Sequence, residues 1–294
     1  MSSVVQKTTR YVVVSPVRDE EQYLEETIRS MVKQTVRPMQ WIIVNDGSTD
    51  RTAEIIDRWA SEHSWIVAVQ RNDRGRREPG SGVIEAFYEG YRTISALDWE
   101  YLIKLDGDLG FEHEYFEKCF AEFDADPALG IGGGVIYHDL NGELQVESNP
   151  RFHVRGANKI YKRPCWEQIT GLLCAPGWDT IDEVKANMLG WSTRSFEHLK
   201  VIQYRLTGAA NGAWRNSIKN GLGSYISGYH PLFMLLKSVK RIVERPCVVV
   251  SAGLLYGFVL GYLRRVPQIE DKNLILYLRE QQLRRLRLSA SIWK

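Results

Sequence analysis

The 294-residue sequence contains only four cysteines, and no two of them stand in the C-x-x-C spacing typical of zinc ribbons. Such sparse, scattered cysteines are typical of free thiols in a reducing compartment. Near the start, residues 11–14 form only a short apolar run, which is too short for the hydrophobic core of a secretory signal peptide. We therefore expect a cytoplasmic location for the main body of the chain.

Acidic residues are scarce towards the end of the chain. From residue 236 onward, 12 Lys and Arg stand against 4 Asp and Glu, which gives this segment a net charge of +8. Because the whole chain carries +2, residues 1–235 carry −6. A basic tail on an acidic body indicates an anionic partner for the tail. No nucleic-acid-binding motif accompanies the charge, so we expect membrane lipid head groups and no nucleic acid.

Short apolar runs alternate with amphipathic patterns through the first 140 residues. The runs predicted as buried strands are residues 10–15, 40–44, 65–69, 101–105 and 130–138. Helices are predicted over residues 19–34, after a cap at Thr49 and Asp50, and over residues 82–97 and 112–123. This alternation predicts an α/β fold with a mostly parallel sheet and helices on both faces. Ligands of such sheets bind beyond the carboxyl ends of the strands.

Acidic or small polar residues follow three of these strands, in the turns SPVRDEE (15–21), NDGSTD (45–50) and DGD (106–108). In a parallel sheet, all three turns lie at one edge. Asp106 and Asp108 should repel each other unless a cation lies between them. Carboxylate oxygens suit Mg²⁺ or Mn²⁺, which often bridge one or two carboxylates to substrate phosphates. For the tripeptide alone an ordinary turn is the favoured explanation, because short motifs recur by chance.

The order of the three turns resembles that of the family 2 glycosyltransferases of GT-A fold, over residues 10–205. Members of that family carry an acidic "DDGSTD" turn after the second strand and a DxD metal motif after the fourth. Here VNDGSTD and DGD occupy those places, about 60 residues apart. The resemblance implies a Rossmann-like GT-A catalytic domain over residues 1–205. Its nucleotide-sugar half covers about residues 1–110 and its acceptor half about residues 111–205.

The resemblance also implies roles for individual residues. The first turn lies near the nucleoside, the acid of the second contacts the nucleobase, and the first acid of DGD lies near the ribose. The implied nucleotide-sugar-binding positions are Pro16, Val17, Asp19, Glu20, Asp46, Asp106 and Gly107. The implied ligands of the divalent metal, Mn²⁺ or Mg²⁺, are Asp108 and Asp106.

A basic loop follows the third strand, RNDRGRREPGSG (71–82). In the resembled family a basic residue of this loop approaches the nucleotide, which here implies Arg76 and Arg77. Guanidinium groups suit phosphate oxygens because their paired N–H donors match the geometry of the oxygens. A solvated loop explains the same arginines, and the sequence leaves both interpretations open.

The general base of the family is the Asp of a Glu-Asp pair, eleven residues before a Gly-aromatic pair. Counting back from Gly190 leads to Asp179, and Trp178 stands where the family has Glu. Asp182 is the second candidate, although the helix dipole alone explains an acid in a first turn. A base in this position implies single displacement with inversion at the anomeric carbon.

The last third of the chain has a different composition. Residues 206–230 are rich in Gly, Asn and Ser and are predicted as loops and short helices that order as a lid over bound donor. Residues 231–294 are predicted as a basic, amphipathic and apolar helical tail. Its uncharged run, residues 247–263, lies at the short limit for a membrane span, which favours peripheral or re-entrant attachment. A helix buried against the catalytic domain is the alternative.

Glycines repeat at every fourth position of the uncharged run, at Gly253, Gly257 and Gly261. A helix face made of small residues lets another helix approach closely. We expect this face to pack against a second helix, and a homodimer is one way to provide it.

Together these features predict a glycosyltransferase. The expected reaction moves one sugar from a UDP-sugar or other NDP-sugar to a hydroxyl of a lipid-linked or cell-envelope glycan, at the inner face of the cell membrane. The Q-x-x-R-W motif of the family's processive synthases is absent, which favours single transfers. Two alternatives are an inactive nucleotide-sugar-binding scaffold and a sugar nucleotidyltransferase. The second would carry a Gly-rich signature after the first strand, which SPVRDEE lacks.

Overall fold

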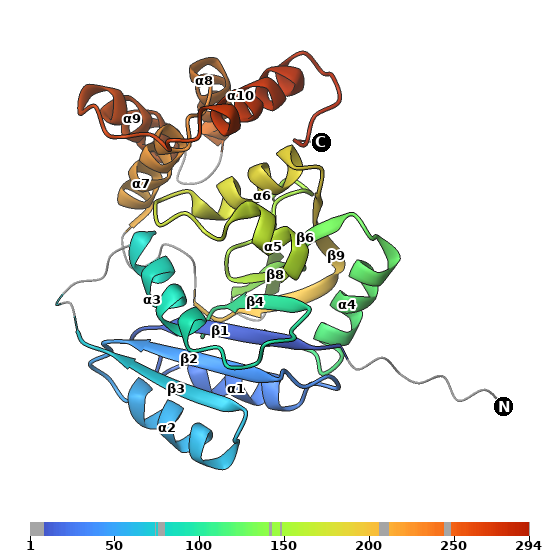
Figure 1. Ribbon diagram of the computed structural model, residues 1–294. Helices are drawn as coiled ribbons and strands as arrows, with labels where there is room; N and C mark the ends of the chain where they lie inside the picture. Colours follow the sequence, from blue (N-terminus) through green and yellow to red (C-terminus); the bar gives the residue numbers. More distant parts are fainter. Residues whose placement is uncertain are drawn as a thin grey trace.

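A computed structural model describes residues 9–73, 75, 80–140, 143–147, 149–205, 212–243 and 248–293. A twisted sheet occupies the centre of the molecule, with helices on both of its faces, and four further helices form a separate layer at one end (Figure 1). This arrangement confirms the predicted α/β fold.

The first half of the sheet is parallel, with the strand order β3–β2–β1–β4. Its strands are β1 (Tyr11–Val17), β2 (Gln40–Asp46), β3 (Ile66–Arg71) and β4 (Tyr101–Leu105). Its helices are α1 (Leu24–Val32), α2 (Thr52–Glu62) and α3 (Ser81–Arg92). All four strands coincide with predicted ones to within two residues at each end, because each is an apolar run closed by a polar turn.

The second half of the sheet is mixed and continues in the order β4–β8–β6–β9–β5. Its strands are β5 (Leu109–Phe111), β6 (Leu129–Leu140), β7 (Glu143–Val146), β8 (Asn158–Lys162) and β9 (Ser192–Gln203). Its helices are α4 (Tyr115–Ala125), α5 (Arg163–Ile169) and α6 (Trp178–Met188). β8 runs antiparallel to both β4 and β6 and so joins the two halves.

Both faces of the sheet are buried, which explains why β1 and β4 are apolar at nearly every position, with Ser15 and Lys104 as the exceptions. Tyr11 and Val13 of β1 belong to one core, which they share with α1, α2 and α4. Val12 and Val14 belong to a second core on the opposite face, which they share with α3, α5 and α6. The polar turns at the strand ends are therefore held between two rigid layers.

The separate layer of helices is called the cap below. It consists of α7 (Gly212–Ile226), α8 (Pro231–Lys240) with the 3₁₀ turn Arg241–Val243, α9 (Val249–Leu263) and α10 (Lys272–Leu286). Its core includes Ile181 and Val184 of α6, so the cap is anchored to the helix that carries Asp179. Loops and short helices were predicted for residues 206–230; the structure describes residues 212–230 and shows there one longer helix, α7, while residues 206–211 lie outside the described residues.

The glycine face of α9 packs against α7 of the same chain. A Cβ atom added at Gly257 would collide with the backbone of Ile218, and one added at Gly261 would collide with Tyr225. The predicted close packing is confirmed, but α7 provides the partner. A homodimer through the face of Gly253, Gly257 and Gly261 is therefore wrong. Within the described ranges, every helix is too short or too polar to pass through a bilayer.

Candidate active site

The three polar turns predicted at one sheet edge lie together in the structure. The backbone N–H of Asp19 donates to Ser48 Oγ over 3.0 Å, and the N–H of Thr49 donates back to Asp19 Oδ1 over 2.9 Å. A Cβ atom added at Gly107 would lie 2.6 Å from Cγ1 of Val17. A glycine at position 107 therefore lets the DGD turn pack directly on the end of β1.

The two carboxylates of the DGD turn have different surroundings. Asp108 is 5% exposed and accepts a hydrogen bond of 3.1 Å from Nε2 of Gln203. Burial and then the charge of Asp106 raise the pKa of Asp108 to about 6. Asp106 is more open and forms an ion pair with the buried Lys104. The raised pKa shows that the ionised form of Asp108 has too little positive charge around it.

A divalent cation fits this pair of carboxylates. Asp108 and Asp106 supply hard oxygen ligands, and a bound cation would offset the repulsion that raises the pKa of Asp108. In the part of the chain that the structure describes, no cluster of three His, Cys, Asp or Glu residues suits a metal ion.

The nucleotide side of the site is organised by arginines. Asp46 is 7% exposed, and its Oδ1 accepts a bond of 2.6 Å from Nη1 of Arg71, at the end of β3. Arg18 donates to the backbone oxygen of Asp46 over 2.9 Å and pairs with Asp73 over 2.7 Å. Sequence analysis missed both arginines. The sequence feature that could have identified them is a basic residue at the carboxyl end of a strand, close to an acidic turn.

The remaining positions of the first turn are Pro16, Val17 and Glu20. Pro16 and Val17 are buried at the end of β1, in register with Val44 and Asn45 of β2. Glu20 accepts a bond of 2.8 Å from Nη2 of Arg205, just beyond the end of β9. The turn is therefore tied to the acceptor half of the domain. The predicted residues Arg76 and Arg77 lie outside the described residues.

Asp179 lies in the first turn of α6, which starts at Gly177 with φ of +89°. Its side chain keeps 26% of its surface exposed, and Oδ2 lies 3.8 Å from Nη1 of Arg155. Burial alone would raise the pKa of Asp179, but the charges of His153, Lys159, Arg155 and Lys104 outweigh it and lower the pKa. Asp179 is therefore an ionised, accessible carboxylate, as a general base requires.

Asp182, the second candidate, is enclosed. It is 3% exposed and accepts bonds from Nζ of Lys159 at 2.8 Å and from the hydroxyl of Tyr161 at 2.6 Å. Lys159 also pairs with Glu183 at 2.9 Å and donates to the backbone oxygen of Asp179. The structure thus separates the two candidates: Asp182 helps hold the first turn of α6, and Asp179 faces outward.

Lys104 lies between the DGD turn and the first turn of α6, and sequence analysis missed it. It pairs with Asp106, and its charge acts to lower the pKa of both Asp108 and Asp179. Its Nζ lies 5.6 Å from the ring of Trp178, and Nζ of Lys159 lies 5.5 Å from the same ring. The signal was present in the strand YLIKL, because a lysine in a buried strand requires a partner.

Replacing Lys159 with Met is expected to reduce the free energy of unfolding by about 3–5 kcal/mol, because two buried carboxylates lose their ammonium partner. Burial already raises the pKa of Asp182 to about 6, although Lys159 lowers it. An acid with a raised folded-state pKa loses its stabilising contribution as pH rises through that pKa. The deficit should therefore be larger at about pH 8 than at about pH 5.

Urea unfolding at the two pH values measures this difference. Lys162→Met on the same strand is the control, since Lys162 donates an exposed hydrogen bond of 3.1 Å to the backbone oxygen of Pro127. The assigned role of Lys159 would be contradicted if both variants lost the same free energy of unfolding, or if the loss in Lys159→Met did not change with pH.

Sequence comparison places this site within a known family. A family model described as glycosyl transferase family 2 matches residues 12–174, which is more than half of the chain. The chain belongs to glycosyl transferase family 2. The match contains all three polar turns, and the family's catalytic activity makes this chain an enzyme, a glycosyltransferase.

Two curated relatives of this family 2 glycosyltransferase come from Streptococcus pneumoniae serotype 4. Glycosyltransferase GlyA is 28% identical over 155 residues, which cover 51% of this chain and 20% of GlyA. Glycosyltransferase GlyG is 29% identical over 133 residues, which cover 45% of this chain and 41% of GlyG. The chain thus matches less than half the length of either relative.

Solved structures show that the family 2 chain has the GT-A fold. The mannosyltransferase PcManGT from Pyrobaculum calidifontis, in complex with GDP-Man and Mn²⁺, has a TM-score of 0.56 at 15% identity, covering 92% of this chain and 79% of its own. S. aureus TarS 1–349 in complex with UDP-GlcNAc has a TM-score of 0.52 at 14% identity. The match covers 94% of this chain and 81% of the TarS chain.

Proposed function

We propose that this glycosyltransferase moves a single sugar from a nucleotide sugar to an acceptor hydroxyl, with inversion at the anomeric carbon. One observation carries the proposal: the two DGD carboxylates, of which Asp108 is buried, and the partly exposed, ionised Asp179 all lie near Lys104. A site for a cation and diphosphate and a site for a base therefore adjoin each other. An inactive nucleotide-sugar-binding scaffold would require neither the ionised base nor its connection to the DGD turn.

The proposed chemistry assigns one step to each group. Asp179 accepts the proton of the acceptor hydroxyl as the hydroxyl oxygen bonds to the anomeric carbon. The bond from that carbon to the diphosphate oxygen breaks on the opposite side, which inverts the configuration. A Mn²⁺ or Mg²⁺ ion at Asp108 and Asp106 would neutralise the charge that develops on the diphosphate. Lys104 holds Asp106 in place through its ion pair.

The proposed donor is a UDP-sugar or another NDP-sugar. Asp46 lies at the carboxyl end of β2, where the nucleobase is expected, and Arg71 fixes its carboxylate. The complexes of the structural neighbours with UDP-GlcNAc and GDP-Man support a nucleotide-sugar donor of this kind. The proposed acceptor is a lipid-linked or cell-envelope glycan, as the poly-β-1,6-N-acetyl-D-glucosamine synthases among the relatives suggest.

A thermal-shift screen of nucleotide sugars, with and without Mn²⁺, tests the proposed donor site. A donor at 100 times its Kd should stabilise the chain by about 2.7 kcal/mol, seen as a higher Tm. The shift should depend on Mn²⁺, since the cation would bridge the donor to Asp108. If no nucleotide sugar raises the Tm in the presence of Mn²⁺, the proposal fails. Donor binding without any turnover would instead favour the inactive scaffold.

A further inference from the structure

Helix α8 carries apolar side chains on two opposite faces. Phe233 and Met234 point into the core of the cap and are buried. The other face, continued by the 3₁₀ turn that follows α8, carries five residues that are each between 42% and 53% exposed and are called the α8 stripe: Leu232, Leu235, Leu236, Val239 and Ile242. Folding of the cap does not require this second face, because the first already joins α8 to the core.

Helix α9 repeats the pattern. Its glycine face packs against α7, while a second face leaves Val249, Tyr256, Val259 and Leu263 between 38% and 76% exposed. These four residues are called the α9 stripe. A helix that is apolar nearly all round is typically buried in protein or in lipid, and the described protein covers only part of this one.

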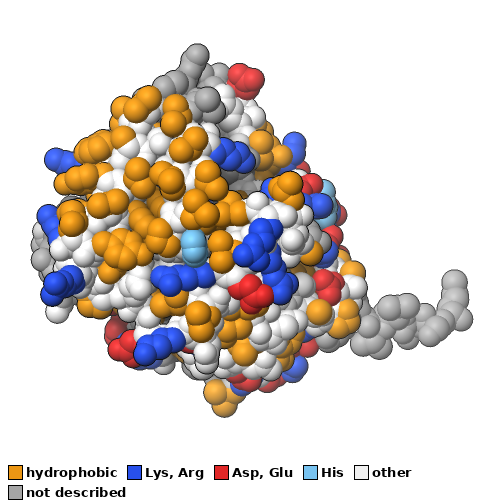
Figure 2. Space-filling model, turned by 90° about the horizontal axis from the view of Figure 1, so that it is seen from above, with side chains coloured by type: hydrophobic (Ala, Val, Ile, Leu, Met, Phe, Trp, Pro, Cys, Tyr) orange, Lys and Arg blue, Asp and Glu red, His pale blue; other side chains and the backbone are white. Residues whose placement is uncertain are grey.

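The two stripes belong to neighbouring helices. Ser251 Oγ of α9 donates a hydrogen bond of 2.6 Å to the backbone oxygen of Ser238 in α8. Figure 2 looks down on the cap and shows hydrophobic side chains gathered across it, with Lys and Arg side chains among and beside them. Exposed apolar side chains gathered in this way on one face mark a binding surface.

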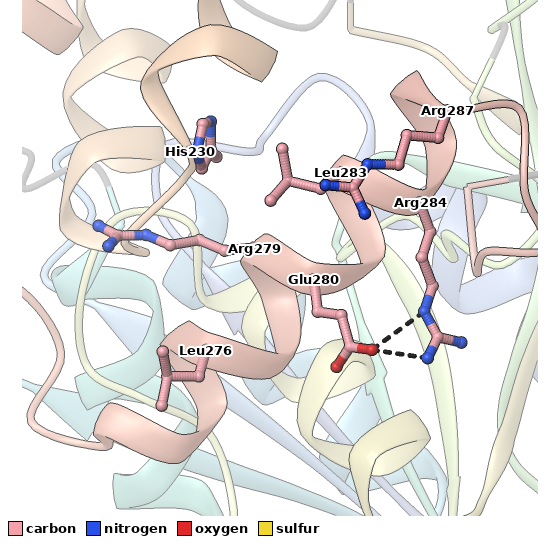
Figure 3. Close-up of a pocket in the computed structure, with 7 residues that line it drawn as sticks. All are labelled: His230, Leu276, Arg279, Glu280, Leu283, Arg284 and Arg287. Carbon is pink, nitrogen blue, oxygen red and sulfur yellow. Dashed lines mark hydrogen bonds and ion pairs between the residues drawn. The ribbon is translucent and has the colours of Figure 1, made fainter.

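Basic residues border the apolar surface. The described residues of the cap, 212–243 and 248–293, include 12 Lys and Arg and only 3 Asp and Glu. Figure 3 shows a hollow between α10 and His230, with Arg279 and Arg287 along it and Glu280 paired with Arg284. A surface that combines apolar stripes with arginines suits a ligand that has an apolar layer beneath a layer of phosphates.

We propose that this face of the cap binds an anionic phospholipid surface. The α8 and α9 stripes enter the boundary of the acyl chains, and Arg264, which follows α9, contacts lipid phosphates together with the arginines of α10 and Arg287. A second copy of the chain fits less well, because two faces of the same positive sign repel each other. The cytoplasmic leaflet of a membrane is anionic and matches the charge of the face. The inference goes beyond sugar transfer and does not depend on it.

Vesicle flotation of the full chain tests the inference. Phosphatidylcholine vesicles that contain phosphatidylglycerol should carry the protein upward, while pure phosphatidylcholine vesicles should carry far less. Leu235→Gln with Leu236→Gln should weaken binding by about tenfold or more, because two leucines no longer enter the apolar layer. Arg264→Gln with Arg287→Gln should weaken it by about fivefold for each charge removed.

Matched variants on the catalytic domain serve as controls. Leu97→Gln removes an exposed leucine, and Arg58→Gln with Arg92→Gln removes two exposed arginines. These controls should bind vesicles like the wild-type chain.

The inference would be overturned if the full chain did not float with anionic vesicles, or if the control variants lost as much vesicle binding as the variants of the cap. Dimerisation in light scattering that Leu235→Gln with Leu236→Gln abolishes, without any vesicle binding, would assign the face to a second copy. Donor-induced Tm shifts, measured in parallel, report on the sugar site independently.

Discussion

Asp179→Asn is expected to lower kcat by about 10²–10⁴-fold, the usual contribution of a general base. The amide retains the size of the carboxylate but does not take up a proton. Donor binding should persist, because the described contacts of the metal turn do not include the Asp179 side chain. Measuring kcat together with the Mn²⁺-dependent Tm shift for the donor separates lost chemistry from lost binding.

Asp182→Asn is the matched control for this prediction. Asp182 is three residues further along the same helix, but it is buried and bonded to Lys159 and Tyr161. Its replacement should change stability and its pH dependence more than kcat. If Asp182→Asn abolished turnover in a folded protein while Asp179→Asn remained active, the assignment of the base would be reversed.

Asp108→Ala is expected to reduce transfer by about 10³-fold, since Lewis-acid stabilisation of the leaving group is worth several kcal/mol. The effect of the cation on donor binding should disappear as well, because Asp108 is the proposed buried ligand of the cation. Without a cation, removal of a carboxylate whose pKa is raised to about 6 should not destabilise the fold through charge. The Tm of the free variant should therefore stay near that of the wild type.

Asp57→Ala, an exposed acid on α2, provides the control for Asp108→Ala. It should retain the Mn²⁺-dependent Tm shift and the activity. A Mn²⁺-dependent donor shift that survives in Asp108→Ala would show that the cation binds elsewhere.

The sequence predicted the nucleotide half of the fold well. The strands β1, β2, β3 and β4 are apolar runs that end in polar turns, and a parallel sheet brings those turns to one edge. That rule predicted that the turns carrying Asp46, Asp106 and Asp108 lie at one edge, and contacts among the three turns agree with it. The family model confirms the family resemblance.

The acceptor half was harder to predict. β8 has the sequence NKIYK, and the buried Asn158 and Lys159 do not look like part of a core strand. Their partners, Tyr115 for Asn158 and Asp182 for Lys159, come from helices far away in the chain. A local pattern of hydrophobicity contains no information on such partners, so the sequence analysis predicts no strand over residues 158–162.

The position before Asp179 shows how the structure refines a motif. Trp178 replaces the Glu of the family's pair, and its ring lies between Lys104 and Lys159. The negative face of an aromatic ring attracts ammonium groups. Trp178 therefore keeps a favourable contact with both lysines although the negative charge of the family's Glu is lost.

The central claim is metal-dependent sugar transfer at the DGD turn, and release of nucleoside diphosphate from a panel of nucleotide sugars tests it most directly. The account predicts that at least one donor releases its nucleoside diphosphate when Mn²⁺ is added. This release should be lost on chelation and strongly reduced in both Asp108→Ala and Asp179→Asn. Release that continues in the chelated wild type, or at an unchanged rate in both variants, would contradict the account.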